Sequence, residues 1–204
     1  LDVGCGIGRM AVALTRYLSS RGEYWGFDIV PSGIYWCQKH IEPQFPNFHF
    51  VHADIYNQLY NPKGKESAST FRFPFLDDHF DFIFATSVFT HMRVAEVERY
   101  FSEVSRVLRP GGRCLLTFFL LNEESSELIR QEKSELDFHL EVGGDLTIDA
   151  QRPERAIAQQ ELVIRQLLPK NKLQIQEPIQ WGRWCGRETF TSFQDMILAI
   201  KDGS

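Results

Sequence analysis

Three glycines and an acid near the start of the chain have the types and spacing of a nucleoside-binding loop. Gly4, Gly6 and Gly8 directly follow the short apolar stretch that ends at Val3. Glycine has no Cβ, so the backbone can turn sharply and approach a ligand closely. The start of a following helix offers free N–H groups to a carboxylate or phosphate. Asp28 lies twenty residues after Gly8, where a carboxylate can accept hydrogen bonds from both hydroxyls of a ribose.

The spacing of the glycines separates two classes of nucleotide site. A dinucleotide loop of the form G-x-G-x-x-G needs glycine at position 9, where this chain has Arg9. The third glycine, Gly8, comes one residue early, which disfavours pyrophosphate binding. If the loop is considered alone, the alternative to nucleoside binding is a tight turn between a strand and a helix that binds no ligand.

Strands and helices alternate along most of the chain. Apolar residues spaced three and four apart predict helices, and short apolar runs bounded by turn residues predict strands. The predicted strands are 1–3, 23–28, 48–52, 80–85, 113–120, 172–181 and 190–201. The predicted helices are 9–19, 31–41, 93–108 and 154–168. Residues 56–75 and 122–150 follow neither pattern.

This alternation is typical of an α/β domain, in which helices cover both faces of a parallel sheet. The turn at 182–187 is too short for the crossover that parallel neighbours need, so we expect the last two strands to be antiparallel. The strand at 80–85 is apolar apart from Asp81, which predicts burial on both faces. The glycine loop and Asp28 follow the first two strands, and such sheets bind ligands at the carboxyl ends of their strands.

The composition disfavours several classes of protein. The 204 residues are 43% hydrophobic and 24% charged, which suits one folded domain rather than a disordered chain. The net charge of -5 makes a nucleic-acid partner unlikely, and no apolar run reaches the ~20 residues of a membrane span. The four cysteines form no CxxC pair and have no metal-ligand spacing. This pattern predicts reduced thiols, no metal site and a cytoplasmic protein.

With these residues in view, the chain resembles the class I S-adenosylmethionine-dependent methyltransferases, in particular the small-molecule enzymes of types 11 and 25. The resemblance spans nearly the whole chain. It rests on residues 1–8, 28, 52–54, 80–83 and 106–112, taken in this order and at these distances. It implies a Rossmann-like three-layer sandwich whose seven-stranded, mostly parallel sheet has the order 3-2-1-4-5-7-6, with only the last strand antiparallel.

The resemblance also assigns contacts to the methyl donor S-adenosylmethionine, whose product is S-adenosylhomocysteine. Asp2 belongs to the motif that would bind this cofactor, and the loop around Gly4, Gly6 and Gly8 would pack against its methionine part. Asp28 would hold the ribose.

The remaining donor contacts implied by the resemblance follow the second, third and fourth strands. Ile29 would cover one face of the adenine. Asp54 would accept a hydrogen bond from the adenine amino group, and the N–H of Ile55 would serve a ring nitrogen. Thr86, after the fourth strand, would lie near the methionine portion.

The expected reaction is an in-line displacement, in which an O, N, S or C atom of a small-molecule acceptor attacks the methyl group. The donor is already activated, so the protein must chiefly align the reactants and exclude water. A general base is needed only if the acceptor must lose a proton. Two histidines are candidates: His91 follows the fourth strand, and His139 lies in the segment 122–150. The alternatives are a structural role for His91 and a surface position for His139.

We interpret residues 1–204 as one methyltransferase domain with a substrate cap inserted at 122–150. This segment is much longer than the usual ~2–6-residue connection and follows the fifth strand at the ligand-binding edge. It contains mixed apolar and polar side chains for an acceptor, such as Phe138 and Asp145, although a decorative surface loop is the alternative. The sequence opens at Leu1, without a methionine and inside a predicted strand, so we expect a missing N-terminal segment.

Three other functions remain open. The first is a non-catalytic module that binds S-adenosylmethionine, which only a turnover assay distinguishes from an enzyme. An NAD-dependent oxidoreductase is disfavoured by the spacing of Gly8 and Arg9 and by Asp54. Cyclopropane formation on lipids lacks the support of an amphipathic membrane-binding stretch.

Arg183 and Arg187 could clamp an acidic acceptor, but charges in a turn are more often solvated. The acceptor and the oligomeric state stay undetermined.

Overall fold

The computed structural model describes residues 1–203, and the chain divides into two compact units. Unit 1 is Leu1–Ser67, and unit 2 begins at Ala68. The main sheet has seven strands in the order β3-β2-β1-β4-β5-β11-β10. Counted along the chain, these seven strands have the order 3-2-1-4-5-7-6, so the predicted Rossmann-like α/β fold is confirmed. Strand β11 runs antiparallel to both β5 and β10, as expected.

Unit 1 is built from parallel strands and two helices. Its elements are β1 (Asp2–Val3), α1 (Arg9–Leu14), β2 (Tyr24–Asp28), α2 (Pro31–His40) and β3 (Phe48–His52). Strand β2 pairs in parallel with both β1 and β3. Pro31 begins α2 because its fixed φ suits the first helical position, where no N–H is needed. The core of this unit contains Phe27, Ile34 and Phe48, each at most 2% exposed.

Helix α1 is shorter than the prediction of 9–19. It ends at Leu14, and the chain continues as turns. Thr15 contributes to this end, since its hydroxyl donates back to the carbonyl of Val12 at 2.8 Å. Tyr17, which lies within the predicted helix, is 83% exposed. The prediction from apolar spacing therefore made this helix about one turn too long.

Unit 2 contains the other four strands of the main sheet. These are β4 (Phe80–Ala85), β5 (Leu108–Phe118), β10 (Leu173–Ile175) and β11 (Asp195–Lys201), with α3 (Val94–Val107) and α5 (Glu161–Lys170). Strands β4 and β5 are parallel. The apolar stripe of α3 is buried as predicted, since Val97, Phe101 and Val104 are 0% exposed.

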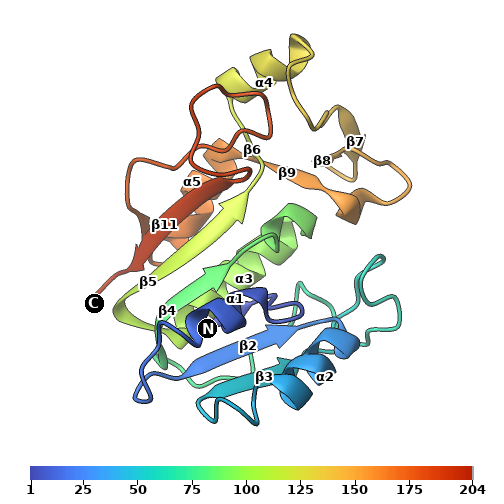
Figure 1. Ribbon diagram of the computed structural model, residues 1–204. Coiled ribbons are helices and arrows are strands. Elements are labelled where there is room, and N and C mark those ends of the chain that lie inside the picture. Colours follow the sequence, from blue (N-terminus) through green and yellow to red (C-terminus); the bar gives the residue numbers. More distant parts are fainter. Residues whose placement is uncertain (204) are drawn as a thin grey trace. The chain divides into compact units, whose positions relative to one another are not determined.

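A second sheet has the strand order β6-β9-β8-β7. Its strands are β6 (Leu120–Leu121), β7 (Leu140–Val142), β8 (Asp145–Thr147) and β9 (Ile157–Gln160), and α4 (Glu123–Arg130) follows β6. We call residues 120–160 the cap. Its elements gather beyond the carboxyl end of β5 (Figure 1). The irregular segment 122–150 is thus part of a longer folded element.

Several predicted boundaries in unit 2 were wrong. The helix expected at 154–168 begins only at Glu161, because residues 157–160 pair with β6 and β8 as strand β9. The strand expected at 172–181 is only β10, and Pro178, just beyond it, lacks the N–H that a ladder needs. The strand expected at 190–201 begins at Asp195, because the preceding loop folds back on residues 181–184.

Two further differences concern the centre of the sheet. Strand β5 was expected at 113–120 but begins at Leu108, which pairs with Phe80 across a register shift. Strand β4 was expected to be buried on both faces, yet Phe82 is 44% exposed. One face of β4 is therefore partly open at this position.

Some properties hold for the described residues as a whole. In residues 1–203, no helix is long and apolar enough to cross a bilayer. Within the same range, no cluster of three or more His, Cys, Asp or Glu side chains has the arrangement of a metal site. The four cysteines are free thiols and are buried.

Candidate functional site

The glycine loop of unit 1 has the backbone that only glycine adopts readily. Gly4, Gly6 and Gly8 all have positive φ angles, of 78°, 56° and 78°. A Cβ on Gly8 would also lie 2.8 Å from the Ile41 side chain, which shows how closely the loop packs. A Cβ on Gly33 of α2 would lie 2.8 Å from the Gly6 carbonyl oxygen. The loop is therefore a tightly held backbone cradle.

Asp28 fixes this cradle from the end of β2. Its Oδ2 accepts a hydrogen bond from the Gly6 N–H at 2.7 Å, and its Oδ1 accepts from the Val30 N–H at 2.8 Å. The side chain is largely buried, with the residue 9% exposed. Each carboxylate oxygen has a second lone pair, so the group can still accept from two ribose hydroxyls. Sequence reasoning found Asp28 but missed its bond to the loop.

Asp2 lies beneath the loop in β1 and is 1% exposed. Its Oδ2 accepts a hydrogen bond from the Tyr24 hydroxyl at 2.6 Å. Its Oδ1 is buried and has no hydrogen-bond partner among the described residues. Burial raises the pKa of Asp2 to about 7, against the opposing effect of the Tyr24 hydroxyl. The structure thus leaves one buried carboxyl oxygen here that a ligand's donor group would satisfy.

Asp54 lies two residues after the end of β3, and the loop that follows contacts both its side chain and its backbone carbonyl. Its carboxylate lies 3.5 Å from the ammonium of Lys65 and 3.5 Å from the side-chain amide of Asn61. Its backbone carbonyl accepts from the N–H groups of Lys65 and Glu66. The N–H of Ile55 donates to the Ala53 carbonyl at 2.8 Å, so in this conformation it is not offered to an adenine nitrogen.

Ile29 and Thr86 belong to different units. Ile29 is half-buried after β2, and its carbonyl lies 3.3 Å from the His52 ring. Thr86 is half-buried after β4 in unit 2. The expected roles of both residues toward the donor stay predictions.

His91 ends a short 3-10 turn, Phe89–His91, that follows β4. Its Nδ1 lies 2.8 Å from the carbonyl oxygen of Glu154 in the cap, which requires the proton on Nδ1. Burial lowers the pKa of His91, and the bond to Glu154 opposes this effect. A neutral ring with Nδ1–H carries its basic lone pair on Nε2. The structure therefore gives His91 a positioning bond, and its lowered pKa favours the neutral ring.

His139 lies on the outside of the cap. Its side chain is 61% exposed and forms an ion pair with Asp137 at 2.9 Å when protonated. This geometry matches the alternative of a surface residue. Of the two histidines, only His91 is held by a buried contact.

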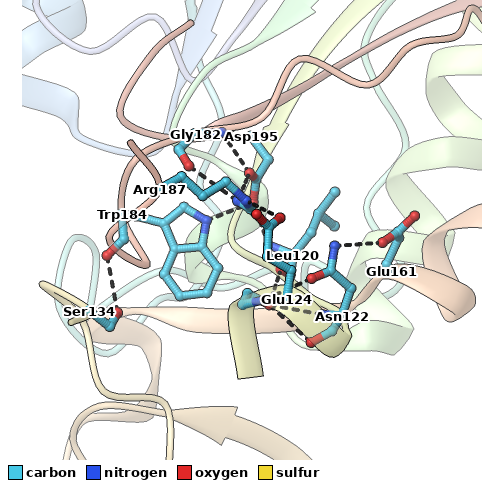
Figure 2. Close-up of polar contacts among 10 residues, drawn as sticks. Leu120, Asn122, Glu124, Ser134, Glu161, Gly182, Trp184, Arg187 and Asp195 are labelled. Carbon is cyan, nitrogen blue, oxygen red and sulfur yellow. Dashed lines mark hydrogen bonds and ion pairs between the residues drawn. The ribbon is translucent and has the colours of Figure 1, made fainter. Parts of the chain in front are cut away.

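Four polar groups join the cap to the rest of unit 2. The carboxylate of Asp195, 0% exposed, accepts from the indole N–H of Trp184 at 2.7 Å and from the Leu120 N–H at 2.8 Å. It also accepts from Gly182 and Arg187. Arg187 in turn donates to Glu124 of α4 at 2.7 Å (Figure 2). We call Asp195, Trp184, Arg187 and Glu124 the cap anchor.

The anchor changes the interpretation of the arginines in the turn. Arg187 is buried rather than solvated, and it is paired with both Asp195 and Glu124. Its guanidinium also lies 4.7 Å from the centre of the Trp181 ring, a cation–π distance. Arg187 therefore holds the cap and is not a free clamp for an acidic acceptor.

Apolar side chains fill the space between the cap and Trp184. The buried members of this cluster are Phe119, Leu121, Phe138, Ala156, Ala158, Trp184 and Cys185. The ring centres of Phe119 and Phe138 lie 5.5 and 5.4 Å from Trp184. Phe138, expected to face an acceptor, is thus part of the cap's core. Asp145 likewise points to the start of α3, where Arg93 and the Val94 N–H lie 3.4 Å away.

Comparison with known proteins identifies the family. A family model described as "Methyltransferase domain" matches residues 1–116, more than half of the chain. The chain belongs to this methyltransferase family. The resemblance to class I S-adenosylmethionine-dependent methyltransferases is thereby confirmed.

Curated relatives match only part of this methyltransferase chain. A phthiotriol/phenolphthiotriol dimycocerosates methyltransferase from Mycobacterium leprae is 36% identical over 115 residues, which cover 55% of this chain and 34% of that protein. A 2-phytyl-1,4-naphtoquinone methyltransferase from Trichormus variabilis is 26% identical, covering 64% of this chain and 51% of that protein. The matches thus span between about a third and a half of these relatives.

Solved methyltransferase structures share the fold. An S-adenosylmethionine-dependent methyltransferase from Methanosarcina mazei has a TM-score of 0.61 at 24% identity, covering 100% of this chain and 92% of that one. A magnesium protoporphyrin IX methyltransferase from Synechocystis, solved with bound S-adenosylhomocysteine, has a TM-score of 0.59 at 16% identity, covering 98% and 73%. At these identities the likeness concerns the fold.

Proposed function

We propose that the chain transfers the methyl group of S-adenosylmethionine to a small-molecule acceptor. The observation that carries this proposal is the cradle of Gly4, Gly6 and Gly8, held by Asp28, in a chain of the methyltransferase family. The residues present fit the donor. The cradle has no room for a Cβ at Gly8, and the unpartnered buried oxygen of Asp2 suits a ligand's donor group.

The donor, when bound, supplies a methyl group attached to a positively charged sulfonium. After transfer, the rest of the donor leaves as the neutral thioether S-adenosylhomocysteine. The chain's own task is to bind, orient and exclude water. The proposed contacts are those of Asp28 to the ribose and of Asp54 to the adenine amino group. In the conformation described, Lys65 lies close to the Asp54 carboxylate and would have to move aside. His91 is the proposed base for acceptors that must lose a proton, because burial favours its neutral form and it follows β4.

We further propose that the acceptor is an apolar molecule with oxygen substituents and that the cap covers it. The printed names of two relatives, a phthiotriol and a naphtoquinone methyltransferase, point to lipophilic, oxygen-bearing acceptors. The cap supports this class because apolar residues such as Leu146 and Ile148 stay only partly buried against its core. A largely apolar lining with few polar groups is typical of small-molecule sites.

Two measurements test the function. Calorimetry should show binding of S-adenosylmethionine and S-adenosylhomocysteine and much weaker binding of NAD; tighter binding of NAD would overturn the donor assignment. A turnover screen then measures S-adenosylhomocysteine release with alkylphenols, 1,4-naphthoquinols and long-chain alcohols. Donor binding with no turnover on any of these would favour a binding module over an enzyme.

A further inference from the structure

A closed ring of hydrogen bonds lies at the carboxyl end of β4 and has no part in the site described above. The N–H of Ser87 donates to the Thr117 hydroxyl at 2.9 Å. The Thr117 hydroxyl donates to Oε1 of Gln194 at 2.7 Å, and Nε2 of Gln194 donates to the Ser87 hydroxyl at 2.8 Å. The three residues come from the ends of β4 and β5 and from the residue before β11. We call them the serine ring.

Ser87 occupies a backbone conformation that serine adopts at a cost. Its φ of 57° lies in the left-handed region, where residues other than glycine are strained. Such strain at a strand end is often part of a functional site. A glycine would satisfy this backbone without strain, so the conformation alone does not account for a serine here.

The ring fixes the role of the Ser87 oxygen as a hydrogen-bond acceptor. Because the Ser87 N–H can only donate, the Thr117 oxygen accepts this hydrogen bond. The Thr117 hydroxyl then donates its own hydrogen bond to Gln194 Oε1. The Gln194 amide then presents its N–H to the Ser87 oxygen. The Ser87 oxygen is thus an acceptor within the ring, and its own proton is not used by the ring, so this exposed hydroxyl can donate to a ligand.

The ring also adjoins the cap. Gln194 stands between Phe193, which packs against the apolar cluster of the cap, and Asp195, which binds the Leu120 N–H. Strands β4 and β5 are parallel, and ligands of such sheets bind at the carboxyl ends of the strands. The Ser87 hydroxyl therefore lies at the edge where such sheets bind ligands, and its ring partner Gln194 is next in sequence to residues that contact the cap.

We infer that Ser87 is an acceptor-binding residue whose hydroxyl donates a hydrogen bond to a second oxygen of an apolar acceptor, apart from the position that is methylated. This inference rests on the proposed methyl transfer. Gln194 and Thr117 are positioning residues, because their polar groups bond to Ser87 and to each other within the ring and act through Ser87.

The test compares two probes that differ by one oxygen, a 1,4-naphthoquinol kept reduced and 1-naphthol. The unaltered protein should prefer the naphthoquinol. Ser87→Gly and Ser87→Ala should each lower kcat/KM for the naphthoquinol by about ten-fold or more and remove the preference, as expected for losing one hydrogen bond to a ligand. Their melting temperatures should differ, because only alanine keeps the strain at positive φ.

A near-isosteric variant tests the direction of the hydroxyl. In Gln194→Glu both side-chain oxygens accept, so the Ser87 proton turns inward and the preference for the naphthoquinol should be lost. Gln180→Glu is the matched control, because Gln180 is exposed, pairs with the same strand at Met196 and lies outside the ring. The dissociation constant of S-adenosylhomocysteine should stay within about two-fold in all four variants.

Each outcome decides between the claims. Unchanged probe preference in Ser87→Gly, with normal turnover, would overturn the inference and leave the proposed function intact. Failure of the unaltered protein to bind S-adenosylhomocysteine would overturn the proposed function. Binding of S-adenosylhomocysteine without binding or turnover of either probe would overturn the acceptor class and this inference with it.

Discussion

Gly6 and Asp28 are joined by a hydrogen bond of 2.7 Å from the loop N–H to the Asp28 carboxylate, across 22 residues of sequence. This bond links the loop after β1 to the end of β2. The other carboxylate oxygen accepts from Val30 at the start of α2. Asp28 therefore holds the shape of the cradle as well as being the proposed ribose ligand.

The first prediction concerns this double role. Asp28→Ala should weaken binding of S-adenosylhomocysteine by about 1.5–3 kcal/mol, because hydrogen bonds to a charged group are lost. Asp28→Asn keeps only one acceptor oxygen and should fall between Ala and the unaltered protein. Calorimetry measures the affinities, and circular dichroism checks the fold. An unchanged dissociation constant in a folded Asp28→Ala protein would contradict the ribose assignment.

The second prediction separates crowding from backbone strain at Gly8. Gly8→Ala places a Cβ 2.8 Å from Ile41 and 2.9 Å from Cys37 at a positive φ, so it should destabilise the protein by about 1–3 kcal/mol and abolish donor binding. Gly111→Ala is the control, since its φ is 75° but no atom lies within 4 Å of the added Cβ. Urea unfolding of both variants measures the difference. Equal losses would show that crowding at Gly8 contributes nothing.

Local patterns were sufficient for the parts of the fold that depend on neighbouring residues. The strands at 48–52 and 80–85 match β3 and β4, because short apolar runs ending in polar residues mark strands reliably here. The glycine loop and Asp28 were singled out because their residue types and spacing are typical of nucleoside-binding loops, and their role toward the donor stays a prediction. The roles of Asp54, Ile55 and Thr86 came from resemblance alone and stay predictions.

A cap was expected at 122–150, but its full extent and its anchoring could not be predicted from local patterns. The bond from the Leu120 N–H to Asp195 spans 75 residues of sequence, and the pair of Arg187 and Glu124 spans 63. Each of these residues looks like an ordinary polar or turn residue in its own segment. Strand β9 was missed for the same reason, since its role is set by pairing with β6 and β8 rather than by its own periodicity.

The third prediction concerns the cap anchor. Arg187→Met should destabilise the protein by about 3–5 kcal/mol, because it leaves the buried Asp195 carboxylate without its cation. Glu124→Gln should cost less than about 1 kcal/mol, because the Glu124 side chain is 60% exposed. Urea denaturation measures both values. If Arg187→Met proves as mild as Glu124→Gln, the guanidinium does not anchor the cap.

The fourth prediction is a pH dependence of stability that comes from His91. Burial lowers the pKa of His91 below its ordinary value of 6.5, so the unfolded chain takes up a proton more readily than the folded one. The contribution of His91 is complete above pH 6.5 and is lost as the pH falls below it. His91→Gln should flatten the dependence of the unfolding free energy between pH 5 and 7, relative to the unaltered protein.

Urea unfolding at a series of pH values measures this slope. His139→Gln is the matched control, because the His139 side chain is 61% exposed and lies outside the buried contact with Glu154. If His91→Gln keeps the full slope, another group accounts for the acid sensitivity.

The apolar cluster around Trp184 has a consequence for how this protein is made. Phe119 and Phe138 are translated well before Trp184 and Asp195, with which they form one core. During synthesis from the N-terminus, a chain that has emerged only to residue 160 therefore exposes these aromatic side chains to the ribosome surface and to chaperones. The cap closes only after Trp184 and Asp195 have left the exit tunnel, so translational stops between residues 160 and 184 should yield aggregation-prone products rather than shortened enzymes.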